Sequence, residues 1–189
     1  MRWRRLDVPG TEEARVIRCG SGWNFIGHLR VVEEGVEARL AYVIECGSDW
    51  RTKTARIDGN VSGETIRFVF VTDGEGNWTR NDVPVPAVRG ALDIDLGFTP
   101  ATNTLPIRRL SLEVGASAGV RSAWLRFPGL HFEPLDQSYT RESERRFRYD
   151  AVVDERPFSA VLETDIFGRV LHYEGLWIAE LMDPDSSVP

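Results

Sequence analysis

Several protein classes are excluded by what this sequence has little of. Among its 23 basic residues only Lys53 is a lysine, and Cys19 and Cys46 are its only cysteines. No apolar run approaches the roughly 18 residues that a membrane-spanning helix needs, and the arginines near the start are not followed by the apolar stretch of a secretory signal. We therefore expect a cytoplasmic protein without stable membrane insertion. Because thiols in that compartment are usually kept reduced, we expect no disulfide between the two cysteines.

Local motifs of common enzyme and metal-binding families are also missing. The three histidines, His28, His131 and His172, are scattered, and none has a second ligand at the spacing of a metal site. The sequence has no Gly-x-Ser-x-Gly turn, no Walker loop and no Cys-x-x-Cys pair. The formal net charge of −6 argues against a nucleic-acid partner, which normally requires a basic stripe. We expect neither a metal nor a cofactor.

The composition is that of one folded domain. The chain has 189 residues, of which 42% are hydrophobic, and a chain of this length buries about 70% of its extended surface on folding. That is enough for one sizeable core, whereas two full domains would be tight. We predict a single domain over residues 1–182, followed by a flexible tail over residues 183–189.

Alternation of apolar and polar residues with a period of two dominates the chain and predicts an all-β fold. Every even position from Val36 to Cys46 is apolar, and residues 145–153 and 157–164 alternate in the same way. Such segments form strands with one buried face. Residues 66–71 and 120–127 are apolar on both faces and predict strands that are covered on both sides. Turn residues recur at roughly 8–12 residue spacing and divide the chain into about a dozen strands.

Residues 72–110 are the least regular part of the chain. They contain four prolines and a glycine-rich turn, which is typical of a linker between two half-sheets. The apolar side chains in this segment argue instead that it packs against the core. The one helical candidate covers residues 106–113, and its length fits a turn or a strand equally well.

Two carboxylates two positions apart, Asp93 and Asp95, are candidates for catalysis. On a strand they share one face with their Cα atoms about 6.6 Å apart, and glycosidases work with paired carboxylates. Arg108 and Arg109 follow within one loop and offer the alternative of structural ion pairs. We favour ion pairing, because neighbouring carboxylates with perturbed pKa values also occur in ion-pair networks that are purely structural.

A polar loop between Pro100 and Pro106 precedes these two arginines. Its hydroxyl and amide side chains either bond to their own backbone in local turns or, together with the arginines, hold a sugar or phosphate head group. Aromatic faces stack on sugars and line apolar cavities, and the chain has six tryptophans. We expect most of them in the core, and Trp50 and Trp78, which lie beside polar or glycine-rich turns, at a rim.

The same loop resembles a known family. Leu92-Asp93-Ile94-Asp95, followed by Thr102-Asn103-Thr104-Leu105-Pro106-Ile107-Arg108-Arg109, resembles the signature of the bacterial Putative glycolipid-binding family, formerly a domain of unknown function. Further matches follow in the same order over most of the chain: Tyr42 with Trp50-Arg51-Thr52, Asp73-Gly74 with Trp78, Gln137 with Tyr139, and Asp165 and Gly168 with Tyr173 and Trp177. The resemblance implies a single-domain spiral β-roll, a half-open barrel of mostly antiparallel strands similar to the folds of bacterial lipoprotein carriers. It implies no catalytic residues.

Three functions are compatible with these residues. The first is non-enzymatic binding of a glycolipid or another amphipathic ligand, with the apolar part in a cleft of the roll. The second is a packed module that interacts with a protein partner of unknown identity, and the third is a hydrolase that uses Asp93 and Asp95. We favour the first. Its candidate ligand-binding residues are Asp95, Asn103, Thr104, Arg108, Arg109, Trp50, Trp78, Tyr139 and Trp177.

Overall fold

The computed structural model describes residues 1–180, so the tail expected over residues 183–189 lies outside the described part. The strands are β1 (Arg2–Arg5), β2 (Gly10–Cys19), β3 (Gly22–Glu33), β4 (Val36–Cys46), β5 (Thr52–Val61), β6 (Glu64–Thr72), β7 (Trp78–Arg80), β8 (Val83–Pro84), β9 (Asp93–Leu96), β10 (Ser117–Arg126), β11 (His131–Ser143), β12 (Arg146–Val153), β13 (Arg156–Thr164), β14 (Val170–Tyr173) and β15 (Trp177–Glu180). The helices are the 3-10 turns η1 (Pro86–Val88) and η2 (Ala101–Asn103) and the α-helix α1 (Thr104–Leu110).

All 15 strands form one sheet, which confirms the predicted all-β fold. The strand order is β8-β7-β6-β5-β4-β3-β2-β1-β15-β14-β13-β12-β11-β10-β9. Neighbouring strands are antiparallel except β9 and β10, which are parallel. The sheet is not closed into a barrel. It has two halves, β1–β8 and β9–β15, which are joined where β1 pairs with β15 and Trp3 lies opposite Ala179.

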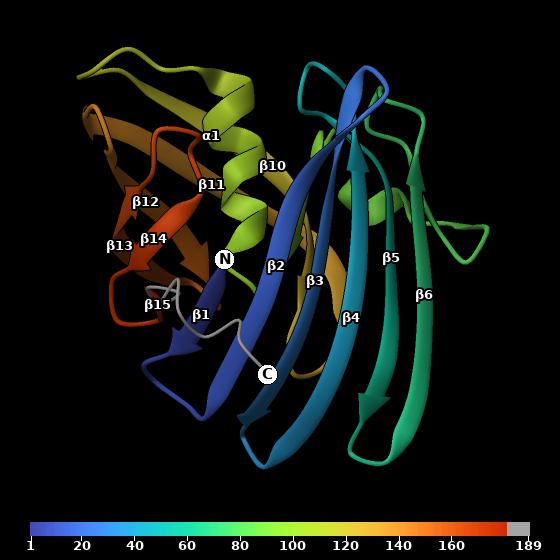
Figure 1. Ribbon diagram of the computed structural model, residues 1–189. Coiled ribbons are helices and arrows are strands. Elements are labelled where there is room, and N and C mark those ends of the chain that lie inside the picture. Colours follow the sequence, from blue (N-terminus) through green and yellow to red (C-terminus); the bar gives the residue numbers. More distant parts are fainter. Residues whose placement is uncertain (181–189) are drawn as a thin grey trace.

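The sheet rolls so that its two halves face each other. In Figure 1 the half-sheet with β2–β6 forms one wall, the half-sheet with β10–β14 forms the other, and α1 stands between them. The walls touch away from the β1–β15 seam, because the rings of Phe70 on β6 and Phe132 on β11 lie 4.3 Å apart. The Thr52 amide at the start of β5 also donates to the Leu92 carbonyl before β9, at 3.1 Å.

Strands that alternate in the sequence also alternate in burial. On β4 the even positions from Ala38 to Cys46 are buried, and β12 and β13 show the same pattern. The expectation of cover on both faces was wrong for β6, where Phe70 is buried but Val71 is 40% exposed. The sheet is a single layer here, and no other element of residues 1–180 covers the outward face of β6.

The irregular segment 72–110 both connects and packs. It carries the chain from β6 to β10, and its side chains Trp78, Val88, Ile94 and Phe98 are buried. The helix begins and ends earlier than the candidate range of residues 106–113, because it starts at Thr104 and stops at Leu110. Ser111 follows in the left-handed conformation and ends the helix.

The expectations on membrane spans, metal sites and thiols concern residues that the structure describes. No helix within residues 1–180 is both long and apolar enough to cross a membrane. The same residues contain no cluster of three or more histidine, cysteine or carboxylate side chains that would hold a metal. Cys19 and Cys46 are free thiols, and burial raises the pKa of Cys46 to about 12.

Candidate functional site

Strand β9 places Asp93 and Asp95 on one side, as predicted, and Asp93 forms the expected ion pair. Arg109, in the last turn of α1, donates from Nη2 to Asp93 Oδ2 at 2.5 Å and from Nε to both carboxylate oxygens at 3.1 and 3.2 Å. Asp93 is fully buried. Burial raises the pKa of Asp93, whereas the hydrogen bonds and charge of Arg109 act in the opposite direction. This pair therefore fixes α1 to the edge strand of the sheet.

Asp95 is held by neutral groups instead of an arginine. Gln137 Nε2 on β11 donates to Asp95 Oδ2 at 2.5 Å, and the Thr102 hydroxyl donates to Oδ1 at 3.3 Å. Close by, the Tyr139 hydroxyl donates to Asn103 Oδ1 at 2.8 Å. Burial raises the pKa of Asp95 to about 6. No water-sized space remains between these side chains, so a substrate has no room beside the carboxylate.

A third carboxylate, Glu12 on β2, was not singled out from the sequence. The hydroxyls of Tyr42 on β4 and Thr99 before η2 both donate to Glu12 Oε1, at 2.5 and 2.7 Å. Glu12 is 1% exposed, and its Oε2 has no hydrogen-bond partner. Burial raises the pKa of Glu12 to about 7. The segment that leads into α1 is thus tied to one half-sheet through Glu12 and to the other through Asp95.

Gly27 on β3 makes room for the Tyr42 side chain to reach Glu12. A Cβ at position 27 would lie 2.3 Å from the Tyr42 ring. We expect Gly27→Ala to lower the free energy of unfolding by about 1–3 kcal/mol, because the ring must move and weaken its bond to Glu12. Urea denaturation measures this loss. Gly35→Ala is not a matched control because that residue has φ +79°, so Gly119→Ala, which meets only the Gln137 carbonyl at 3.9 Å, serves instead.

Helix α1 contributes the exposed Arg108 to an aromatic cluster with the half-buried Trp23 and Phe167 and with Trp50, which is 7% exposed. The two tryptophan rings stack with centroids 5.1 Å apart, and Phe167 packs edge-on against both. The guanidinium of Arg108 lies 5.0 Å from the centroid of Trp50 and 5.1 Å from that of Phe167. Trp50 has φ +67°, an unusual conformation for a bulky residue that marks many ligand-binding sites.

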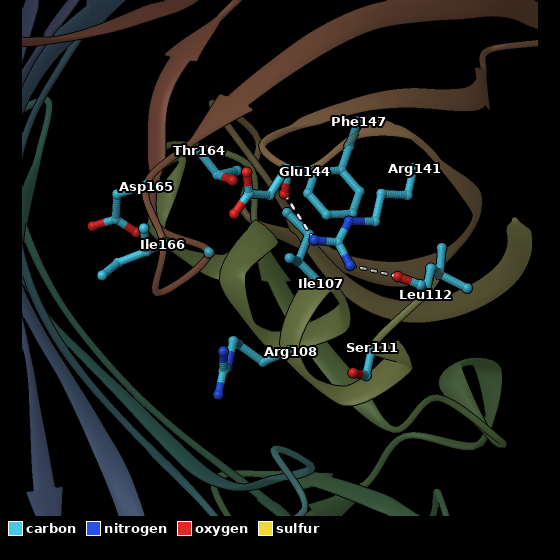
Figure 2. Close-up of a pocket in the computed structure, with 11 residues that line it drawn as sticks. Ile107, Arg108, Ser111, Leu112, Arg141, Glu144, Phe147, Thr164, Asp165 and Ile166 are labelled. Atoms are coloured by element: carbon cyan, nitrogen blue, oxygen red, sulfur yellow. Dashed lines mark hydrogen bonds between the residues drawn. The ribbon is translucent and has the colours of Figure 1, made fainter. Parts of the chain in front are cut away.

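A small polar hollow lies beside this cluster, at the end of α1. Figure 2 shows Arg108 on one side and Arg141 with Glu144 on another. The volume is about 90 Å³, roughly that of three water molecules. Arg141 donates to the carbonyls of Leu112 and Glu144 at 2.7 and 2.8 Å. Ile166 on the rim is 79% exposed.

The structure divides the predicted ligand-binding residues among several places. Asp95, Asn103, Thr104 and Tyr139 lie in the interior beside η2 and α1, and Arg109 pairs with Asp93. The exposed Arg108 covers the buried Trp50. Trp78 and Trp177 lie elsewhere in the core. Trp78 is 2% exposed and donates to the Ala91 carbonyl. Trp50 is 7% exposed and belongs to the core cluster, so the expected position at a rim was wrong for both tryptophans.

Comparisons with known proteins agree with the architecture. The sequence model of the family described as Putative glycolipid-binding matches residues 1–179, which include both half-sheets and α1. Among solved structures, the crystal structure of a DUF1089 family protein from Pseudomonas aeruginosa is 30% identical, with a TM-score of 0.80. The similarity covers 89% of this chain and 92% of that one. No curated protein matches the chain.

Proposed function

Because this chain belongs to the family described as Putative glycolipid-binding, we propose that it binds a glycolipid or a related amphipathic molecule and catalyses no reaction on it. The observation that carries this proposal is Arg108. Its guanidinium is exposed, lies over Trp50 and Phe167, and has no carboxylate partner among the described residues. A fixed cation beside aromatic rings and a polar hollow offers contacts to a sugar head group.

The hollow provides both donors and acceptors for such a head group. Sugar hydroxyls donate and accept hydrogen bonds, and Ser111, Glu144 and Arg108 line the hollow with a hydroxyl, a carboxylate and a guanidinium. With about 90 Å³ the hollow takes only part of a sugar ring. The remainder of the head group would lie over the aromatic cluster.

The apolar part of the ligand has a different place from the cleft expected inside the roll. Helix α1 stands in that interior (Figure 1), where its residues from Thr104 to Ile107 are buried. We therefore place the acyl chain outside the roll, over the rim at Ile166. The two carboxylates of the hydrolase alternative already have structural partners. Asp93 binds Arg109 of α1, and Asp95 binds Thr102 in the segment that precedes α1. This favours binding over hydrolysis.

Two measurements test the proposal. Native mass spectrometry of the protein purified from its own host should show a stoichiometric extra mass that passes into the organic phase on denaturing extraction. Calorimetric titration with octyl glucoside below its micelle concentration should show saturable binding, and Arg108→Ala should weaken it about tenfold through loss of the guanidinium contact.

The control for this titration is Arg156→Ala, which removes an exposed arginine from the turn at the start of β13. It should bind as the unaltered protein does. If delipidated protein binds neither octyl glucoside nor any component of a host lipid extract, the proposal is wrong. The filled interior would then favour the packed module that contacts a protein partner.

A further inference from the structure

The outward face of β2–β6 carries aliphatic side chains that do not contact the core. We call these residues the outer stripe: Ile17, Ile26, Val43, Val69 and Val71. They come from β2, β3, β4 and β6, and α1 lies on the inner side of the same half-sheet (Figure 1). Ile17 and Val71 are each 40% exposed. No other element of residues 1–180 forms a layer over this face.

Strand register sets three residues of the outer stripe in one row with two arginines. Ile26 lies directly opposite Val43, Arg56 on β5 lies opposite both Val43 and Val69, and Arg15 on β2 lies opposite Ile26. The row therefore crosses five strands, from Arg15 on β2 to Val69 on β6. With strands about 4.8 Å apart, it spans roughly 19 Å. Two arginines are therefore set into a row of aliphatic side chains.

The cations of this face are in excess after its internal ion pairs are counted. Within the face Glu37 pairs with Arg39 and Asp58 with Arg67. Glu13 lies 3.8 Å from Arg2 of β1, which is closer to Glu180 at 3.1 Å. Arg15, Arg56 and Arg30 have no hydrogen-bond acceptor or ion-pair partner within residues 1–180. Glu45 is the one acid that faces outward here without a described partner. The outward positions of β2–β6 carry five arginines against four acids, on a chain whose formal charge is −6.

We propose that the outer stripe docks on a bilayer surface that contains anionic phospholipid. Phosphate oxygens would accept hydrogen bonds from Arg15, Arg30 and Arg56, and the short aliphatic side chains would rest at the level of the head groups. Each basic residue near such a surface strengthens binding about fivefold. This inference stands apart from the head-group hollow, which lies at the end of α1.

Protein occupants fit this face less well. A second copy would stack sheet on sheet at about 10 Å and bury Arg15 and Arg56 without partners, which is strongly unfavourable. Energetically dominant residues of protein interfaces are enriched in tryptophan and tyrosine. The outward positions of β2–β6 carry no tryptophan, tyrosine or phenylalanine.

Vesicle co-sedimentation tests the proposal. The full chain should bind vesicles of phosphatidylcholine with about 30% phosphatidylglycerol, but not phosphatidylcholine alone, and about 500 mM NaCl should release it. The double variant Arg15→Gln/Arg56→Gln should bind about 30-fold more weakly. The control Arg146→Gln/Arg148→Gln on β12 makes the same change in net charge on the other half-sheet and should bind normally.

Each other outcome overturns the proposal. Equal losses in both double variants would show that only net charge matters, and no sedimentation of the unaltered chain would show that the face does not meet lipid. Binding to poly-glutamate without binding to vesicles would identify an acidic protein partner. A dimer that Ile26→Ser dissociates would identify a second copy. Arg108→Ala should leave sedimentation unchanged, so failure here and failure of glycolipid binding are distinguishable.

Discussion

Glu12→Gln is expected to make the protein about 3 kcal/mol more stable than the unaltered chain near pH 8, and equally stable near pH 4. The pKa of Glu12 is raised from 4.5 to about 7 by burial. The folded state therefore keeps a proton that the unfolded state has lost between these two values. Stability from this group is complete below pH 4.5 and is lost as the pH rises through 7.

Glutamine reproduces the protonated side chain, because its oxygen accepts from Tyr42 and Thr99 and its amide replaces the protonated oxygen. Urea denaturation at a series of pH values gives the difference between the two proteins. Asp95, whose pKa is raised to about 6, adds a decline in the same direction. That decline is common to both proteins and cancels in the difference.

The matched control for Glu12 is its neighbour Glu13→Gln. Glu13 lies on the same strand, but its side chain points outward and is 73% exposed. Its substitution removes the same formal charge from an exposed position and should change the free energy of unfolding by less than about 0.5 kcal/mol. A difference between Glu12→Gln and the unaltered chain that stays constant across this range would show that Glu12 is ionised in the folded protein.

Arg109→Ala is the substitution from which we expect the largest loss, about 3–5 kcal/mol of unfolding free energy at neutral pH. It removes three hydrogen bonds and the countercharge from Asp93, whose side chain is 1% exposed. A buried carboxylate then remains without a partner. Adding Asp93→Asn to this variant should recover part of the loss, because a neutral amide is less costly to bury than a charge.

The adjacent Arg108→Ala separates stability from binding. Arg108 is exposed and has no carboxylate partner among the described residues, so its removal should cost less than about 1 kcal/mol. The pair of variants thus assigns anchoring of α1 to Arg109 and ligand contact to Arg108. Equal stability of the two variants would contradict the structural role of Arg109.

The parts of this architecture that depend on neighbours in the sequence could be predicted. The period of two between Val36 and Cys46 determines which face of β4 is buried, whatever strands lie beside it. The Asp93–Arg109 pair could also be predicted, since its partners are only 16 residues apart in the sequence. Position alone did not indicate which of the two arginines would turn inward.

Features that depend on distant packing could not be predicted. Glu12 and Thr99 are 87 residues apart, and nothing local shows that β2 and the lead-in to α1 become neighbours. Only a weak signal in the sequence pointed to a buried Glu12. This carboxylate occupies an inward position of an alternating strand, and Gly27 lies on the next strand. The glycine-rich turn before Trp78 predicts a position at a rim, but rolling of the sheet brings the centroid of its ring 5.8 Å from that of Phe132.

The seam between β1 and β15 also constrains the order in which the chain folds. Each half-sheet consists largely of hairpins between consecutive strands, so its pairs can form as soon as they are synthesised. Strand β1 is different, because its second neighbour lies about 175 residues later in the chain. Until residues 177–180 leave the ribosome, β1 is an open edge. Its outward-pointing Arg2 and Arg4 place positive charge on that edge, a feature that discourages pairing with other chains.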